Sequence, residues 1–439
     1  MSQKELYAVA GLALALALFG AVPPAQGQAG TWAGKSLETM IDKAQWKFGP
    51  LRGNTSLTVA NAGYESDIYY GYLTDAVPDF SLAASIPVQV LFPLGKKVVL
   101  EIYDSPQYLF YLSTKRERAW NNAFRGQVHL SLDRLYVQAS AGRSNVRQRL
   151  SPELDINVRL KEDRLNGTVL YQVSQKGSLA FLYRVTNYDH GDAQFEGTQI
   201  GKSLNRREDF FDLVAYVQPN SGMRFYLDGQ FGTSKFADPT ATYKNARSYG
   251  VFGGLDFIPA VENTKRVAKI QGGIGLGYMR FDMVDPARVD GSDFIGNVRV
   301  SVRLKERITA RASFSRGFQY SIYSGATYYV SLNYGGGLEY LLSRHASVSY
   351  DIYFARSNYP VDETGGGVVR EGVFNLYTTH MFGLNIRVAR QLTVTVTGML
   401  GKRAADPTSL ARNRNFFGLS FVYGAATGTV SAPSSPIAR

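Results

Sequence analysis

Cysteine is absent from this chain of 439 residues, and histidine occurs only four times, at His129, His190, His345 and His380. Without cysteine the protein cannot form disulfides, thiolate zinc sites, a cysteine nucleophile or the acylated cysteine of a lipoprotein. Histidines scattered this widely argue against a multi-histidine metal centre. We therefore expect neither a metal nor another cofactor.

Long apolar runs are also absent beyond residue 30, which excludes further membrane-spanning helices. Residues 1–29 have the pattern of a secretory signal peptide, with Lys4 before an apolar run from Leu6 to Val22 and small residues at Ala25 and Gly27. An uncleaved anchor is the alternative, but the run is short for one. We expect an exported protein, so the net charge of +12 is not taken as a sign of nucleic-acid binding.

From about residue 52 onward, apolar and polar residues alternate with a period of two, which is typical of β-strands. In 328–342, for example, tyrosine, valine and leucine occupy one face, while serine, asparagine, glycine and glutamate occupy the other. About 18 such segments follow one another: 52–62, 79–92, 97–112, 121–133, 134–147, 152–173, 177–190, 205–218, 222–236, 244–258, 266–282, 291–304, 307–321, 326–342, 345–359, 371–388, 391–402 and 413–424.

The connections between these segments alternate in length. Short turns such as 93–96 and 305–306 are usually followed by longer polar loops such as 63–78 and 191–204, which is the signature of an up-and-down outer-membrane barrel. A soluble sandwich is the alternative for any single strand, but polar faces rich in Arg, Asn, Gln and Asp suit a water-filled lumen better than a packed core. We predict an all-β fold: a transmembrane antiparallel up-and-down β-barrel of the outer membrane, with about 18 strands and a range of roughly 16 to 20.

The expected domain order follows from these patterns. Residues 30–51 form a periplasmic N-terminal segment with a short amphipathic helix over 36–44, residues 52–424 form the barrel, and residues 425–439 form a disordered tail rich in Ala, Ser, Pro and Thr. Aromatic residues near segment ends, as in membrane-interface girdles, are Tyr328, Tyr340, Phe374, Phe382, Phe417 and Tyr423. The alternation changes phase near Glu162–Arg164, where either a bulge or an additional hairpin would account for it.

Alternation also predicts which side chains line the lumen. An Arg or Lys facing lipid at mid-depth costs about 2–4 kcal/mol, so such residues should face water. The basic candidates are Arg125, Arg159, Lys161, Arg184, Arg224, Lys269, Arg299, Arg303, Arg311 and Arg387. The other polar candidates are Asp228, Gln230, Asp256, Asn297, Asn333, Glu339, Asp351 and Asn385. This basic excess favours an anion-preferring path, and rim positions that bind lipopolysaccharide phosphates are the alternative.

No constellation of catalytic residues emerges. A Ser-His-Asn hydrolase needs three groups converging on one face, and His129 has only Gln127 and Ser131 beside it, so we expect a hydrogen-bonded lumen histidine. The acidic residues of 189–192 are expected to be solvated rather than to bind calcium. The glycine runs 272–275 and 335–337 lie inside strands with no helix following, so bends or close backbone approach explain them better than phosphate binding.

Three groups of short segments resemble one family. They are 63–70, then 108–112 with 115–121, and the best match, RLKEDRL at 159–165 followed by YQVSQKGSL at 171–179. These segments resemble outer-membrane β-barrel porins associated with exopolysaccharide and capsule export systems. The resemblance implies a passage for a secreted polysaccharide, paired with a periplasmic export protein, and it implies no catalytic residues.

The sequence thus predicts a protein that is not an enzyme and sits in the outer membrane of a Gram-negative cell. Its expected function is to form a passage for secretion of an extracellular polysaccharide, with an acidic one favoured by the basic lumen. A general or anion-selective diffusion porin is the alternative, and an outer-membrane enzyme or an adhesive barrel fits less well. Expected partners are outer-membrane lipid and lipopolysaccharide, the polysaccharide and the periplasmic export protein.

Overall fold

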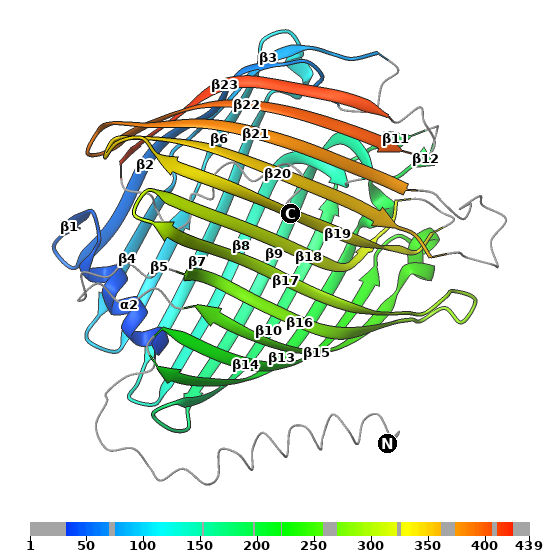
Figure 1. Cartoon of the computed structure of the whole chain (residues 1–439). Coiled ribbons are helices and arrows are strands. Elements are labelled where there is room, and N and C mark those ends of the chain that lie inside the picture. Colours follow the sequence, from blue (N-terminus) through cyan, green and yellow to red (C-terminus); the bar gives the residue numbers. More distant parts are fainter. Residues whose placement is uncertain are drawn as a thin grey trace.

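The computed structural model describes residues 32–69, 75–151, 153–195, 198–220, 222–257, 270–322, 326–360, 374–405 and 411–424. These residues form a closed barrel of antiparallel strands (Figure 1). The expected signal peptide (1–29) and C-terminal tail (425–439) lie outside the described residues, as does Lys269.

Strands make up about 75% of the described chain. The wall consists of β2 (Leu51–Glu65), β3 (Asp79–Ser85), β4 (Val88–Leu94), β5 (Val98–Asp104), β6 (Gln107–Tyr111), β7 (Ala119–Ser131), β8 (Leu135–Ser151), β9 (Leu154–Gln172), β10 (Gly177–His190), β13 (Arg206–Asn220), β14 (Met223–Phe236), β15 (Ala246–Phe257), β16 (Ile270–Met283), β17 (Gly291–Lys305), β18 (Ile308–Tyr320), β19 (Tyr328–Leu341), β20 (Ala346–Asn358), β21 (Phe374–Ala389), β22 (Leu392–Ala405) and β23 (Arg412–Gly424). The remaining elements are α2 (Trp32–Asp42), β1 (Trp46–Phe48), β11 (Gln194–Phe195), β12 (Thr198–Gln199) and the 3₁₀ turns η1 (Lys115–Glu117), η2 (Lys202–Leu204) and η3 (Pro239–Lys244).

The wall closes where β23 pairs with β2. Two neighbouring wall strands are each interrupted by a proline, which cannot donate a ladder hydrogen bond. Pro87 separates β3 from β4, Pro106 separates β5 from β6, and the amide of Ile86 donates to the Pro106 carbonyl at 3.2 Å. Each interrupted pair occupies one place in the wall, so the described strands fill 18 places, which confirms the predicted strand number.

The phase change near Glu162–Arg164 is neither a bulge nor a hairpin. The pairing of β9 with β8 and with β10 continues in register through these residues. Below this point Leu165 and Val169 face outward and are exposed, whereas above it Val158 and Leu160 are buried. The apolar face therefore changes sides where the hairpin leaves the membrane zone, because outward residues meet lipid below that level and water above it.

The outward face of the wall is apolar. Side chains such as Phe294, Leu338 and Phe417 are at least half exposed, which in water would be an aggregation surface and in a bilayer is the lipid-facing belt. Of the expected girdle residues, Tyr340, Phe382, Phe417 and Tyr423 lie exposed on this face, and Phe374 has no described side chain. Tyr328 is instead buried against Phe281 and Phe318. No helix among the described elements is long and apolar enough to cross a membrane.

The two ends of the barrel differ. At the short-turn end, connections such as 95–97, 132–134 and 306–307 contain a few residues, while the long-loop end carries β11, β12 and the 3₁₀ turns. Figure 1 shows α2 at the short-turn end and β11 and β12 at the other end. Short turns face the periplasm in outer-membrane barrels, which orients the molecule.

Candidate functional site

The α2 helix lies inside the short-turn end of the lumen. It starts at Trp32, four residues before the predicted start at residue 36, and ends at Asp42. Leu37 is buried on its inner face, with Ala33 and Ile41 packed beside it. The wall residues that pack around Leu37 are Leu91, Val99, Tyr136, Leu170, Ala180 and Val214. The helix therefore occupies one side of this opening.

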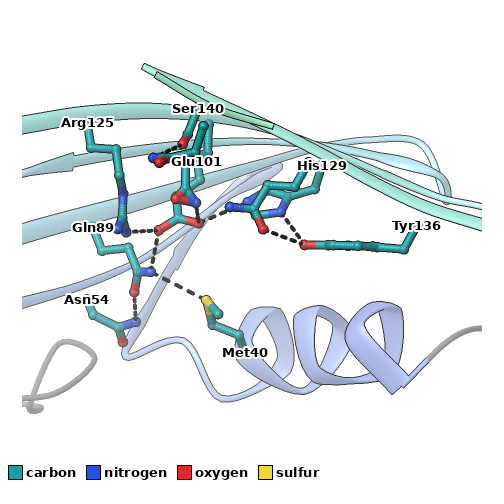
Figure 2. Close-up of polar contacts among 11 residues, drawn as sticks. Met40, Asn54, Gln89, Glu101, Arg125, His129, Tyr136 and Ser140 are labelled. Atoms are coloured by element: carbon teal, nitrogen blue, oxygen red, sulfur yellow. Dashed lines mark hydrogen bonds and ion pairs between the residues drawn. The ribbon is translucent and has the colours of Figure 1, made fainter. Parts of the chain in front are cut away.

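A polar network centred on Glu101 lies next to this helix (Figure 2). Glu101 accepts hydrogen bonds from Gln89 at 2.9 Å and Arg125 at 3.4 Å, and it contacts the Nε2 of His129 at 3.0 Å. The hydroxyl of Tyr136 lies 2.7 Å from the Nδ1 of the same histidine. His129 is thus a hydrogen-bonded lumen residue, as the sequence predicts.

The Glu101 network joins strands whose backbone pairing is interrupted. Asn54 of β2 donates to Gln89 of β4 at 3.0 Å, and Glu101 lies on β5, five residues before Pro106. The same Gln89 contacts the sulfur of Met40 on α2 at 3.4 Å. The network therefore links five neighbouring strands, β2, β4, β5, β7 and β8, to one another and to the helix. Sequence reasoning missed Glu101 and Gln89, although a glutamate between Leu100 and Ile102 was the available signal.

Several predicted lumen residues are paired across strands. Arg311 bridges Asp351 at 3.0 Å and Glu339 at 3.5 Å, and Arg224 binds Asp256 at 2.6 Å. Shorter polar side chains pair in the same way: Gln230 with Asp212, Asn333 with Ser315, and Asn385 with Ser347 and Thr395. The two arginines thus neutralise three of the four predicted lumen carboxylates, Asp256, Glu339 and Asp351.

Other predicted residues remain open to the lumen. Arg299 and Arg303 share the inward face of β17 with Asn297, and Arg387 lies on the inward face of β21; all four are exposed. None of these arginines forms an ion pair with another residue that the structure describes. Arg184 is also exposed, with its guanidinium 4.8 Å from the ring centre of Phe210.

Arg159 and Lys161 do not line the lumen, contrary to the prediction. They lie on the outward face of β9, above the level at which the apolar face changes sides, and they border a cleft of about 600 Å³ among the outer loops. In the same cleft Lys161 pairs with Asp189 at 3.8 Å, and Lys202 pairs with Asp192 at 3.3 Å. Within the described residues no three His, Asp or Glu side chains are grouped as metal ligands.

The long-loop end is crossed by the tip of the β8–β9 hairpin, which we call the latch (residues 147–158, residue 152 excepted). β8 and β9 are the fifth and sixth wall strands, whereas Ser321 and Ile322 follow the thirteenth, across the barrel. Glu153 at the latch tip is fully buried and accepts hydrogen bonds from the Ser321 hydroxyl and the Ile322 amide, both at 2.7 Å. The latch therefore spans the mouth and docks on the far side.

Further contacts hold the latch in place. Arg403, on β22, donates to the Glu153 carbonyl at 2.6 Å, and Lys244 donates to the Ser321 carbonyl at 2.8 Å. Arg149 donates to the Tyr377 hydroxyl at 2.6 Å. Apolar latch residues pack against the outer loops; the buried cluster contains Leu150, Val158, Ala193, Ile200, Leu204 and Ile322. The lumen is thus covered at this end by the latch.

The latch should respond to pH through two buried groups. Burial raises the pKa of Glu153 and lowers the pKa of Lys244 to about 8. Protonation of Glu153 therefore favours closure at low pH, and this contribution is lost as the pH rises through its raised pKa. Loss of the Lys244 proton favours closure at high pH, and this contribution is lost as the pH falls through about 8. We expect the largest open fraction between these two pKa values, measured as channel conductance against pH.

Two variants separate the acidic and alkaline sides of the profile of conductance against pH. Glu153→Gln should remove the dependence on the acidic side, and Lys244→Met should remove it on the alkaline side. A profile that is unchanged in both variants would show that these groups do not control the latch.

Neither a protein-family model nor a curated protein matches this chain. Among solved structures, a mutant of the ferric enterobactin receptor from Pseudomonas aeruginosa is similar with a TM-score of 0.44 and 12% identity, over 87% of this chain and 81% of the receptor. The siderophore receptor PirA from Pseudomonas aeruginosa gives a TM-score of 0.42 and 11% identity, over 85% and 80% of the two chains. The FrpB iron transporter from Neisseria meningitidis gives a TM-score of 0.42 and 11% identity, over 83% of this chain and 63% of the transporter. Likeness at this level does not extend to what the chain binds or transports.

Proposed function

We propose that this barrel is a gated conduit of the outer membrane through which an extracellular polysaccharide leaves the cell. The observation that carries the proposal is a polar lumen whose outer mouth is closed by the docked latch. A lumen lined by hydrogen-bonding groups suits a hydroxyl-rich polymer, and a closed mouth suits a cargo that passes only on demand. The sequence segments that resemble polysaccharide-export porins point in the same direction.

The charge of the short-turn end supports export of an acidic polymer. The turns at this end and the residues bordering them carry two described acidic residues, Asp133 and Glu306. Their basic residues are Lys96, Lys97, Arg134, Lys176, Lys305, Arg307, Arg344 and Arg390, all exposed. Such an excess raises the local concentration of anions at the periplasmic opening, and the open Arg303 and Arg387 continue it into the lumen.

A diffusion porin is the second candidate. A porin passes solutes through a permanently open channel, whereas here the latch covers the mouth and α2 narrows the other opening. A periplasmic partner that displaces α2 from the lumen would complete an export route. A polysaccharide export protein with an acidic face toward the membrane is the partner we expect at this rim.

Charge reversal of Arg299 and Arg303 to glutamate should weaken the anion preference of the opened channel. At about 8 Å in water a unit charge changes the energy of a passing ion by roughly 0.5 kcal/mol. Reversing two charges changes the total by four units, or about 2 kcal/mol, so the anion-to-cation permeability ratio should fall by at least about thirtyfold at low salt. The measurement is the reversal potential in a planar bilayer under a salt gradient, with the latch opened by Glu153→Ala.

Block of the same current by added oligosaccharide tests the cargo. Oligogalacturonate should interrupt the current of the opened wild-type lumen more often than that of the double variant. Arg143→Glu is the matched control, because Arg143 lies on the outward face of the hairpin and is 70% exposed. Single-channel currents that no oligosaccharide interrupts would favour a diffusion porin over a polysaccharide conduit.

A further inference from the structure

The glycines of β15 and β16 are positions where aromatic rings lie against bare backbone. A Cβ at Gly254 or at Gly275 would overlap the side chain of Tyr226, which projects from β14. A Cβ at Gly277 would likewise overlap the ring of Phe252. The close approach expected for the glycine run 272–275 is therefore, at Gly275, an approach by a tyrosine.

These contacts fix how the two rings lie. Because the Tyr226 side chain reaches over Gly254 on the next strand and Gly275 on the one after, it runs along the wall instead of projecting into the lumen. Both Tyr226 and Phe252 are half-buried, whereas the outward rings Phe225 and Tyr249 on the same strands are exposed. One face of each inward ring thus rests on glycine backbone, and both rings lie on the inward side of the wall.

Polar groups surround the two rings. Asp228 stands opposite Phe252 in the β14–β15 register, two residues from Tyr226, which is about 7 Å along a strand. Asp228 forms no hydrogen bond or ion pair with another residue that the structure describes. Next to it, Arg224 is held by Asp256 and Gln230 by Asp212. The rings are therefore flanked by an unpaired carboxylate and by groups that are already oriented.

We infer that Tyr226, Phe252 and Asp228 form a binding platform for a neutral pyranose unit of the exported polymer. A pyranose has an apolar face of C–H groups that stacks on an aromatic ring and a rim of hydroxyls that donate to a carboxylate. The unpaired Asp228 repels an acidic sugar, so the platform is specific for neutral units. Tyr226 also packs against the α2 cluster, so the platform lies beside this helix. This inference rests on the proposed function.

The test is the dwell time of a neutral oligosaccharide in the opened channel. With Glu153→Ala present, maltohexaose should block the current of the otherwise unchanged barrel. Tyr226→Ala and Phe252→Ala should each shorten the blocked time about tenfold, as the loss of one ring contact predicts. Tyr226→Phe should keep the dwell time, because the ring remains.

Phe225→Ala is the matched control. Phe225 is the residue before Tyr226 on the same strand, but it faces outward and is 44% exposed, so its loss should leave the dwell time unchanged. Gly254→Ala is a second variant that keeps every ring: its methyl group would push Tyr226 off the wall, which should lower the open-channel conductance.

The outcomes separate this inference from the proposed function. Block by maltohexaose that is equally long in Tyr226→Ala, Phe252→Ala and Phe225→Ala overturns the platform while leaving a sugar conduit intact. Block by oligogalacturonate alone also overturns it, because the platform is assigned to neutral units. A lumen that neither oligosaccharide blocks removes the conduit itself.

Discussion

Replacing Glu153 by alanine is expected to open the outer mouth of the barrel. The substitution leaves the Ser321 hydroxyl and the Ile322 amide without the carboxylate that binds both in a fully buried position. Two hydrogen bonds to this buried carboxyl group contribute about 2 kcal/mol together, so the ratio of open to closed channels should rise roughly thirtyfold. The measurement is the open probability of single channels in a planar bilayer.

The control for this variant lies on the same hairpin. Arg143→Ala breaks an exposed ion pair with Asp163, and such surface pairs are worth about 0–1 kcal/mol, so the open probability should change by less than about fivefold. Variants that still migrate as heat-modifiable folded barrels can be compared directly. An open probability in Glu153→Ala equal to that of the control would mean that the latch does not gate the channel.

Replacing Leu37 by glutamate is expected to expel α2 from the lumen. Leu37 is 4% exposed at the centre of an apolar cluster, and burying an unpaired carboxylate there costs several kcal/mol. A helix of 11 residues keeps its position only through packing, so it should leave instead of rearranging. The periplasmic half of the lumen would then be open to water along the whole wall.

The absence of cysteine makes this second result easy to measure. Ala180 is 3% exposed beneath the helix, and cysteine introduced there would be the sole thiol of the chain. A charged thiol reagent should label Ala180→Cys at least about a hundredfold faster in the Leu37→Glu background, in line with several kcal/mol of lost packing. Leu37→Met, which conserves volume, should leave the rate low.

A second cysteine reporter distinguishes displacement of α2 from a general opening of the barrel. Asn297 is exposed in the lumen away from α2, so Asn297→Cys should react at the same rate in both backgrounds. Fast labelling of Ala180→Cys with Leu37 intact would show that α2 does not rest on this wall.

The strand number was predictable from the sequence because the signal is local. A residue between lipid and water must alternate in polarity with its neighbours, and this holds for each strand independently of its partners. The same rule misplaced Arg159 and Lys161, because above the membrane both faces of the hairpin meet polar surroundings or protein. The phase change at Glu162–Arg164 was therefore a sign of depth, not of an extra strand.

The positions of the latch and of α2 at the two ends of the lumen, and the pairing of the lumen charges, were not predictable in the same way. That Arg311 meets Asp351 depends on the register between strands 40 residues apart, which period-two alternation leaves free. Glu153 meets Ser321 through a separation of 168 residues, and its burial results from the latch crossing the mouth. The helix over 36–44 was expected from its amphipathic pattern, but its position inside the lumen depends on contacts with six different wall residues.

The proline breaks have a mechanical consequence. At one level of the cylinder, Pro87 and Pro106 interrupt adjacent strands, and close by β2 is bulged at Asn61, which has a φ of 54°. A ring of hydrogen-bonded strands resists changes of cross-section everywhere except where such bonds are missing, so this sector is a compliant seam in an otherwise stiff tube. The side-chain hydrogen bonds of the Glu101 network join the strands of this sector and limit how far they separate. Such a tube can deform from round to oval at one sector, and its bore can change in width without losing the seal against lipid.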